Sequence, residues 1–301
     1  MYRSFADIEK YILDSKISKK VVLAGSHDPD ALSSVVEARR KGIISACLIG
    51  DIAKTKELLK EMGEPEDGYH FVDEAYGQLA AHLACAMVYK GEADIPMKGK
   101  LITADFMRAV LDKQYGFIPE GGMLCQATVL EYAYENRLMI ISDCAVNVAP
   151  DYEGKKKILI NAVDLAHQLD IECPKVAVIA PVELVNPKIQ PTIDAAMLAK
   201  AGQRGQIQGC VIDGPLALDN AVDAEAAASK GIVSEVAGQA DVLIMPDLCT
   251  GNVFTKSLHY FARMKQSGSI TGADIPVVMT SRTDTPEDKY FSILVSVMQS
   301  L

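Results

Sequence analysis

Three side chains near the end of the chain combine types that act together in group transfer. Ser281 and Arg282 follow an apolar run at 276–279, and Asp288 comes shortly afterwards. A guanidinium can hold two oxygens of a phosphate, a hydroxyl can donate to an oxyanion, and a carboxylate can accept a proton. The residues from Thr285 to Asp288 also have the pattern of a helix N-cap, with an acid placed to close a capping box. Both a catalytic and a capping role therefore stay open for Asp288.

Two other apolar runs lead into residues that could bind a substrate. Lys98, Gly99 and Lys100 end the first run. A lysine beside exposed backbone amides can hold a phosphate, although a solvated turn explains the same residues. Asp213 and Gly214 end the second run, and ligands of open α/β sheets bind at the carboxyl ends of strands. Both places are therefore candidates for binding a substrate.

The residues after Pro246 form a further candidate. A buried strand is expected to stop at Pro246, and a polar loop is expected to run into a helix that begins near Asn252. Gly251 would let the backbone approach a ligand, the helix N-terminus would face an anion, and Lys256 would follow one turn later. Cys249 lies in the same loop with no histidine near it in the sequence, so we expect a passive thiol.

The loop after the first apolar run carries a histidine. Gly25-Ser26-His27-Asp28 is not a dinucleotide-binding fingerprint, and the sequence contains no P-loop motif. Asp28 and Pro29 have the pattern of an N-cap followed by proline at the first helical position. We therefore expect His27 to serve the turn rather than to act as a base.

Short apolar runs alternate with amphipathic stretches along the whole chain. The runs are continuous rather than alternating in polarity, which is typical of strands buried on both faces of a parallel sheet. Amphipathic stretches such as 192–201 and 221–230 separate them, and this order predicts an α/β fold with crossover helices. The clearest runs are 21–24, 43–49, 138–141, 176–179, 211–212, 242–245 and 275–279.

Composition excludes several classes of protein. The 301 residues are 49% hydrophobic, which argues against a disordered chain, and the net charge of −10 argues against a nucleic-acid surface. No stretch has the ~20 apolar residues of a membrane span, and the first residues do not resemble a signal peptide. The seven cysteines are irregularly spaced without a CxxC pair. We expect a cytoplasmic protein without disulfides or a zinc site.

Taken together, these motifs resemble the phosphate acetyltransferase and phosphate butyryltransferase family. The resemblance covers nearly the full length, and the stretch 213–221 looks closer to the butyryl branch. It implies two α/β lobes of the isocitrate/isopropylmalate dehydrogenase-like type, with mostly parallel sheets, an interlobe cleft and a homodimer or higher homo-oligomer. We expect residues 1–117 and 272–301 in one lobe and 118–271 in the other. The matching stretches are 142–150, 213–221, 246–252 and Ser281-Arg282 with Asp288.

The resemblance also implies a reaction, in which an acyl-CoA and phosphate interconvert with an acyl phosphate and CoA. The CoA thiol attacks directly, so neither a metal nor a cofactor is expected, and CoA is a substrate. By resemblance, Arg282 grips phosphate, Ser281 stabilises the oxyanion and Asp288 deprotonates the thiol. A base is chemically sensible because a thiol with a pKa near ~8.5 is mostly protonated at neutral pH.

The chain departs from the family pattern at two places. Butyryltransferase-like members commonly have a Ser-His-Val run where this chain has Leu124-Cys125-Gln126-Ala127, and a histidine is often found where Ile102 precedes Thr103. These departures bear on the acyl chain that is accepted. They are also compatible with a sensor of acyl-CoA or acyl phosphate that has lost turnover. A third class, a metal- and NAD-dependent hydroxy-acid dehydrogenase of the same fold, would need clustered ligands, whereas Asp213, Asp219 and Asp247 lie in separate segments.

Overall fold

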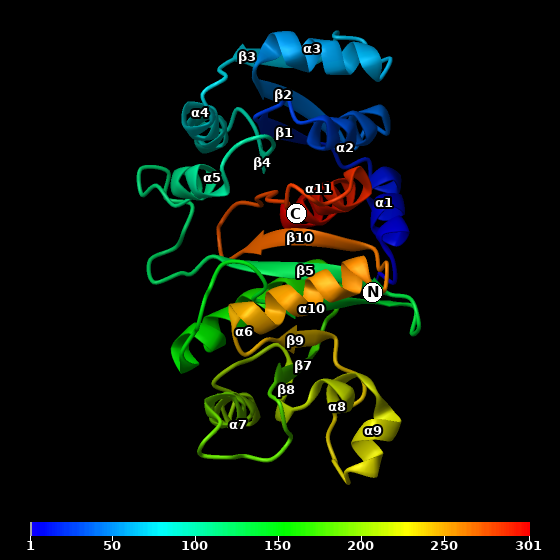
Figure 1. Ribbon diagram of the computed structural model, residues 1–301, viewed down its shortest axis with the longest axis vertical. Helices are drawn as coiled ribbons and strands as arrows, with labels where there is room; N and C mark the ends of the chain where they lie inside the picture. The colour runs from blue at the N-terminus through cyan, green and yellow to red at the C-terminus, as the bar shows by residue number, and fades with distance from the viewer. Residues whose placement is uncertain (1) are drawn as a thin grey trace. The chain divides into compact units, whose positions relative to one another are not determined.

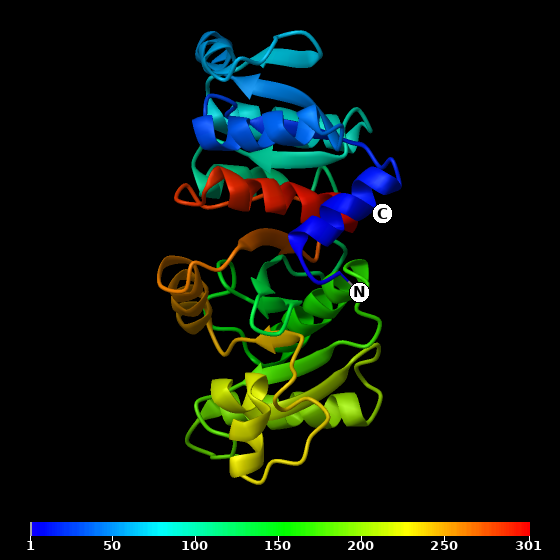
Figure 2. The same cartoon turned by 90° about the vertical axis from the view of Figure 1, so that its right-hand side faces the viewer.

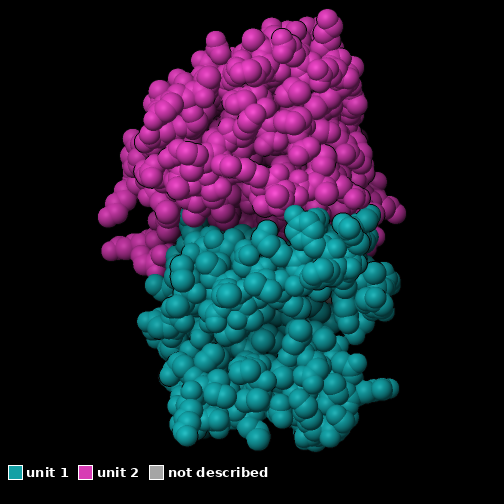
Figure 3. All heavy atoms as spheres, viewed as in Figure 1, with its two compact units in different colours: residues 1–4, 123–266 teal, residues 5–122, 267–301 magenta. Residues whose placement is uncertain are grey.

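The computed structural model describes residues 2–301, which divide into two compact units (Figure 3). The first unit contains Met123–Gln266 together with the N-terminal residues as far as Ser4. The second unit contains Phe5–Gly122 and Ser267–Leu301. The boundaries expected from the sequence, after residue 117 and before residue 272, both lie inside the second unit. The second unit is thus built from two parts of the chain that are far apart in sequence.

The second unit contains a parallel sheet in the strand order β3-β2-β1-β4 (Figure 1). The residues 21–24 of its inner strand have no exposed surface, as expected for a continuous apolar run covered on both faces. All four carboxyl ends therefore lie along one edge of this sheet. The strands are β1 (Lys19–Ala24), β2 (Ile44–Gly50), β3 (Tyr69–Asp73) and β4 (Ile95–Lys98).

Helices from both parts of the chain complete the second unit. The last helix, α11, packs against α1 and α2, and Figure 2 shows α11 alongside α2. Every residue of α11 from Asp288 to Met298 is buried, and the rings of Phe5 and Phe291 stack with centroids 4.2 Å apart. The helices are α1 (Phe5–Asp14), α2 (Pro29–Arg40), α3 (Ile52–Glu61), α4 (Gly77–Tyr89), α5 (Thr103–Val110) and α11 (Pro286–Gln299).

The first unit contains strands in the order β5-β6-β9-β7-β8. β5 and β6 are antiparallel, whereas the other neighbours are parallel, so the expected α/β class with mostly parallel sheets is confirmed. The strands are β5 (Cys125–Tyr132), β6 (Arg137–Ser142), β7 (Lys175–Ile179), β8 (Val211–Leu216) and β9 (Val242–Ile244). The helices are α6 (Tyr152–Gln168), α7 (Gln190–Gln203), α8 (Leu218–Val222), α9 (Ala224–Ser229) and α10 (Leu248–Tyr260). β10 (Gln266–Thr271) leads back to the second unit.

One expected strand is much reduced. The run 275–279 makes isolated bridges, from Val278 to Met97 and from Val277 to Ile270, instead of a regular strand. Pro276 and Pro96 lack the N–H groups that a longer ladder would use. Among residues 2–301, none of the helices combines the length and the apolar character that crossing a bilayer demands.

Candidate functional site

Three backbone segments meet at the carboxyl edge of the sheet in the second unit. The N–H of Lys98 donates to the carbonyl of Val278 over 2.9 Å, which places the segment leading to Ser281 beside the end of β4. The N–H of Gly99 donates to the carbonyl of Ala24 over 2.8 Å, which joins the loop after β4 to the end of β1. These bonds bring Lys98 and the Ser281 segment together.

Gly99 is required by this packing. A Cβ at Gly99 would collide with the carbonyl oxygen of Gly25, and a Cβ at Gly25 would lie 2.8 Å from the amide nitrogen of Lys100. Gly25 also has a φ of +77°, a conformation that other residues rarely adopt. The missing side chain of Gly99 therefore allows close packing against the protein's own loop.

The side-chain ammonium of Lys98 is buried and has few hydrogen-bond partners. Its residue is 2% exposed, and its Nζ has one long contact, 3.4 Å to the carbonyl of Gly99. Burial lowers the pKa of Lys98, and the positive charges of Arg282 and Lys289 lower it further, against the opposing effects of Asp28 and Asp284. Because the charged form is disfavoured here, a bound anion would stabilise it.

Arg282 projects into solvent from a short turn. Its side chain makes no hydrogen bond or ion pair with any residue that the structure describes, from 2 to 301, and it lies close enough to Lys98 to affect that lysine's pKa. A guanidinium near a buried ammonium concentrates positive charge that no ion pair within residues 2–301 neutralises, although Asp28 and Asp284 act on Lys98 from nearby. This place therefore favours an anion with several oxygens, such as phosphate.

The turn itself is closed by side-chain and backbone hydrogen bonds. The N–H of Ser281 donates to Oδ2 of Asp284 over 2.7 Å, and the N–H of Asp284 donates to the carbonyl of Ser281 over 3.3 Å. The hydroxyl of Ser281 lies 3.1 Å from that of Thr283, and both residues are exposed. The Ser281 hydroxyl is thus accessible at the same exposed turn that carries Arg282.

Asp288 closes the capping box that its sequence pattern predicts. The N–H of Asp288 donates to the Thr285 hydroxyl over 3.1 Å, while Oδ2 of Asp288 accepts from the N–H and the hydroxyl of Thr285 at 3.2 and 2.6 Å. The residue is 5% exposed at the start of α11. The capping role is confirmed, and the catalytic role stays a prediction because both can belong to one carboxylate.

The loop after β1 has the expected helix start. Asp28 caps α2 by accepting from the N–H groups of Asp30 and Ala31, each at 3.1 Å, and Pro29 is the first helical residue. Nδ1 of His27 accepts from the N–H of Asp51 over 3.3 Å. Burial lowers the pKa of His27, and Lys100 lowers it further, so the neutral ring is favoured.

In the first unit, α10 begins earlier than the sequence suggested. Asp247 caps the helix by accepting from the N–H of Thr250 over 2.8 Å, so Gly251 and Asn252 lie inside the first turns and the expected polar loop is absent from residues 248–252. A Cβ at Gly251 would collide with the carbonyl oxygen of Asp143. The amide of Asn252 donates to the carbonyl of Cys144 over 3.1 Å. Both residues therefore hold the loop after β6, and Lys256 is exposed further along the helix.

Asp143 orders that same loop from within. This residue is 2% exposed, and its carboxylate accepts from the N–H groups of Ala145 and Val146 at 2.8 and 2.9 Å and from the amide of Asn147 at 2.6 Å. Asp143 lies in the stretch 142–150 that resembles the family, but no role was predicted for it from the sequence. A buried carboxylate with several donors was not visible from residue spacing.

Asp213 and Gly214 lie within β8 rather than in a loop after it, which corrects the expected strand end at residue 212. A Cβ at Gly214 would lie 2.9 Å from the carbonyl oxygen of Val178 and 3.1 Å from Cβ of Ala195. Gly214 thus allows β8 to pack closely on β7 and α7. The strand continues because its neighbour β7 supplies partners beyond the two-residue apolar run.

A hollow lies at the strand ends of the first unit. It has a volume of about 450 Å³, and most of its lining is apolar. It lies where β7, β8 and β9 end, which is the edge where open α/β sheets bind ligands. The lining residues are Ile179, Ala180, Pro181, Pro191, Ala217, Leu218, Pro246, Asp247 and Thr250.

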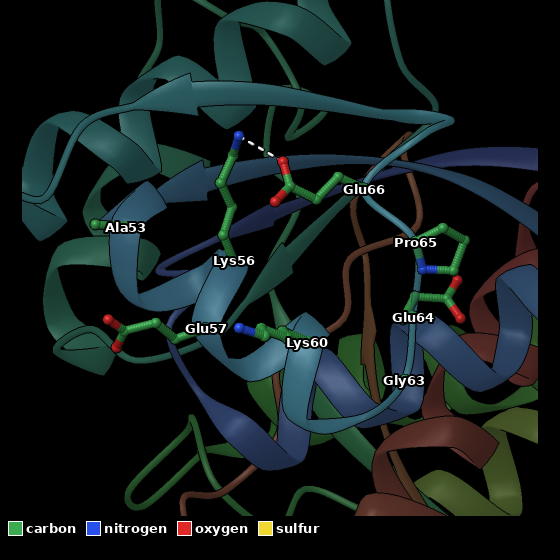
Figure 4. A pocket seen from close by; sticks show the side chains of 8 residues that line it. All are labelled: Ala53, Lys56, Glu57, Lys60, Gly63, Glu64, Pro65 and Glu66. Carbon is green, nitrogen blue, oxygen red and sulfur yellow. Dashed lines mark ion pairs between the residues drawn. The ribbon is translucent and has the colours of Figure 1, made fainter.

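A larger hollow on α3 does not share the charge of the Arg282 region. Its volume is about 570 Å³, and lysine and glutamate side chains face each other across it (Figure 4). Lys56 pairs with Glu66 over 2.6 Å, and Glu64 pairs with Arg39 and Arg40. Because these charges compensate one another, the hollow has no preference for an anion.

The two departures from the family pattern occupy different environments. Gln126 is buried in β5, where its amide donates to the carbonyl of Ala127 over 3.0 Å. Ile102 is 59% exposed at the residue before α5. Within residues 2–301, no group of three or more His, Cys, Asp or Glu side chains is arranged to hold a metal ion.

Comparison with known proteins shows that the chain is similar to one group of enzymes over nearly its full length. The profile of the family described as phosphate acetyl/butaryl transferase matches residues 69–297. A phosphate butyryltransferase of Clostridium acetobutylicum is 42% identical over 298 residues, which cover 99% of this chain and 98% of that protein. A phosphate acetyltransferase of Thermotoga maritima is 39% identical over 280 residues, which cover 93% of this chain and 95% of that protein.

A solved structure agrees with these sequence relatives. The crystal structure of a branched-chain phosphotransacylase from Enterococcus faecalis superposes with a TM-score of 0.83 at 27% identity. The superposition covers 94% of this chain and 99% of that one, so both units are included. The family match also includes Lys98, Ser281, Arg282 and Asp288.

Proposed function

This chain belongs to the phosphate acetyl/butaryl transferase family, and we propose that it transfers butyryl or a similar short acyl group between CoA and phosphate. The family resemblance of the motifs is thereby confirmed, and the chain is a phosphate acyltransferase. The observation that supports the proposed site is the guanidinium of Arg282, which has no hydrogen bond or ion pair within residues 2–301, follows Ser281 in the chain and lies near the buried ammonium of Lys98.

Arg282 and Lys98 bind the phosphate or the phosphoryl end of the acyl phosphate. The planar guanidinium matches two phosphate oxygens, while the ammonium supplies a charge that no carboxylate of residues 2–301 neutralises by an ion pair. The Ser281 hydroxyl donates to the oxygen of the acyl carbonyl as that oxygen becomes negative. Arg282 and Lys98 thus provide positive charge and Ser281 provides a hydrogen bond, and both stabilise the negative charge of the transition state.

Asp288 accepts the proton of the CoA thiol when acyl-CoA is formed. The thiolate sulfur then bonds to the carbonyl carbon, the bond from that carbon to the phosphate oxygen breaks, and phosphate leaves. The proton passes from Asp288 to the solvent or to phosphate. The reverse sequence uses phosphate as the nucleophile and returns the proton to sulfur. CoA is a substrate throughout, and no cofactor or metal is required.

The first unit has candidate substrate-binding residues of its own in this proposal. Gly251 and Asn252 act by fixing the loop after β6, and the exposed Lys256 attracts the anionic groups of CoA. Asp213 and Gly214 lie in β8, and Gly214 allows this strand to pack closely on β7. The apolar hollow of about 450 Å³ suits an alkyl chain or another apolar part of the substrate.

We also propose that the enzyme works in the cytoplasm as a homodimer or higher homo-oligomer, with no nucleic-acid or membrane partner. The cysteine content supports a reducing compartment, because the chain has seven thiols and no disulfide among the described residues, 2–301. The net charge of −10 supports the absence of a nucleic-acid partner. Light scattering during gel filtration measures the oligomeric order directly.

We expect CoA release from butyryl-CoA that requires added phosphate and is unchanged by EDTA. The physical reason is that Arg282 and Lys98 supply the positive charge that a metal ion would otherwise provide. Free thiol is followed with a chromogenic reagent, with a phosphate-free reaction as the control. Acetyl-, propionyl- and isobutyryl-CoA in the same assay give the acyl preference. Activity that EDTA removes and magnesium restores would contradict the mechanism, and butyryl-CoA binding without thiol release would favour a sensor.

Cys249→Ser is expected to retain substantial activity. The thiol of Cys249 is exposed at the start of α10, but direct attack by CoA forms no acyl-enzyme. Rates are compared with those of Cys173→Ser, which removes another exposed thiol. The enzyme is incubated with butyryl phosphate, the reaction is quenched, and the intact mass of the protein is measured. An acyl thioester on Cys249 would show that the direct-attack scheme is wrong.

A further inference from the structure

The turn that carries Ser281 and Arg282 is tied to α11 by a buried lysine. Nζ of Lys289 donates to the carbonyl of Ser281 over 3.0 Å and to the carbonyl of Asp284 over 2.6 Å. Lys289 is 1% exposed. One ammonium group therefore holds both ends of the turn from which the Ser281 hydroxyl and the Arg282 guanidinium project.

The position of this lysine is unfavourable by itself. It lies in the first turn of α11, where the helix dipole disfavours a cation, and the residues that follow it are buried and largely apolar. Within residues 2–301 it forms no ion pair with a carboxylate, and its ammonium donates to two backbone carbonyls, which offset part of the cost of burying its charge. An apolar side chain would fill the same space without that cost.

The charge has a second consequence for the site. Lys289 lies close enough to Lys98 to lower the pKa of that lysine, as Arg282 also does. Three cationic side chains thus lie near one another, two of them buried. A positive cluster of this kind is tolerated when it arranges or attracts an anionic ligand.

We propose that Lys289 is a positioning residue for phosphate use, which fixes the Ser281–Asp284 turn so that Ser281 and Arg282 face the same bound group. The inference rests on the proposed function. Lys289 was not a sequence candidate because it follows Asp288 directly and resembles one more polar residue of a helix start. The signal that was present is a lysine immediately before the largely apolar run from Tyr290 to Val295.

Lys289→Met tests this role because methionine keeps the length of the side chain and removes the charge and both hydrogen bonds. We expect kcat/KM for phosphate to fall about 10²-fold, since small misplacements of catalytic groups have effects of that size. The KM for butyryl-CoA should change much less than the KM for phosphate. Lys289→Gln, which keeps a donor in a similar volume, should recover part of the loss.

Lys155→Met is the matched control. Lys155 is another buried lysine, 4% exposed, which pairs with Asp194 over 2.7 Å in the first unit. Its loss breaks a buried ion pair, so it should lower the melting temperature at least as much as Lys289→Met. It should leave the KM for phosphate unchanged. A purely structural lysine at position 289 would behave like this control.

Amide hydrogen exchange provides a readout that does not depend on activity. The peptide that contains residues 281–284 should exchange faster in Lys289→Met than in the wild type and in Lys155→Met. If the wild type releases no CoA, the proposed function fails while this exchange result still decides whether Lys289 holds the turn. A folded Lys289→Met protein with wild-type exchange in this peptide and a wild-type KM for phosphate would overturn the proposal, as would a folded Lys289→Gln protein that recovers none of the loss.

Discussion

Asp288→Asn should lower kcat by about 10²–10⁴-fold, the range for loss of a general base, with a small change in melting temperature. Asparagine is nearly isosteric, and its carbonyl oxygen can still accept from the N–H and the hydroxyl of Thr285, as Oδ2 of Asp288 does. The loss of stability should stay within the ~1 kcal/mol of a cap change. The amide cannot take a proton from the CoA thiol, so turnover should fall much more than stability.

The pH dependence and a cap variant separate the two roles of Asp288. The rate deficit of Asp288→Asn should shrink as the pH approaches the thiol pKa of ~8.5, because more CoA is then already thiolate. Thr285→Ala removes the capping hydroxyl and leaves the carboxylate, so it should lower the melting temperature with a smaller effect on rate. Normal turnover in an Asp288→Asn protein of lower stability would leave Asp288 as a helix cap and nothing more.

Arg282→Lys should raise the KM for phosphate by about 10–100-fold, which corresponds to losing one charge-assisted hydrogen bond. Lysine keeps the positive charge but cannot present two parallel N–H groups to phosphate. Because Arg282 is exposed and contacts no partner within residues 2–301 by hydrogen bond or ion pair, the melting temperature should not change. Initial rates are measured with phosphate varied at saturating butyryl-CoA.

A second arginine provides the comparison for this prediction. Arg108 is exposed on α5 and pairs with Asp105 over 2.6 Å, outside the turn that carries Ser281. Arg108→Lys should leave the KM for phosphate at the wild-type value. An Arg282→Lys enzyme whose KM for phosphate equals that of the wild type would show that the assignment of Arg282 is wrong.

The strands were the part of the fold that residue patterns predicted best. The runs 21–24, 138–141 and 176–179 lie within β1, β6 and β7, because short, continuous apolar runs rich in Val and Ile favour strands that are covered on both faces. Capping patterns were equally local. Asp28 with Pro29, and Thr285 with Asp288, form the caps that their spacing predicts, since a cap is decided within four residues.

Errors arose where tertiary packing overrode a local signal. Gly251 reads as a loop residue, yet it lies in α10 because Asp247 caps the helix before it and the absent Cβ leaves room for the carbonyl of Asp143. Gly214 likewise belongs to β8, where it allows close approach to Val178. A glycine is required by what lies next to it in space, and that neighbour is not identified by nearby sequence.

By itself, the sequence determined the α/β class and the family, and it led to the proposal of Ser281, Arg282 and Asp288 as a catalytic set, because these inferences depend on residue types and short spacings. The tertiary structure decided which other charges join them. Lys98 reaches the same region because the end of β4 pairs with Val278, a residue distant in sequence. Lys289 reaches back from α11 to the turn before it. Electrostatic interactions between these side chains depend on short distances in space. Those distances exist only after the chain has folded, so residue spacing does not reveal them.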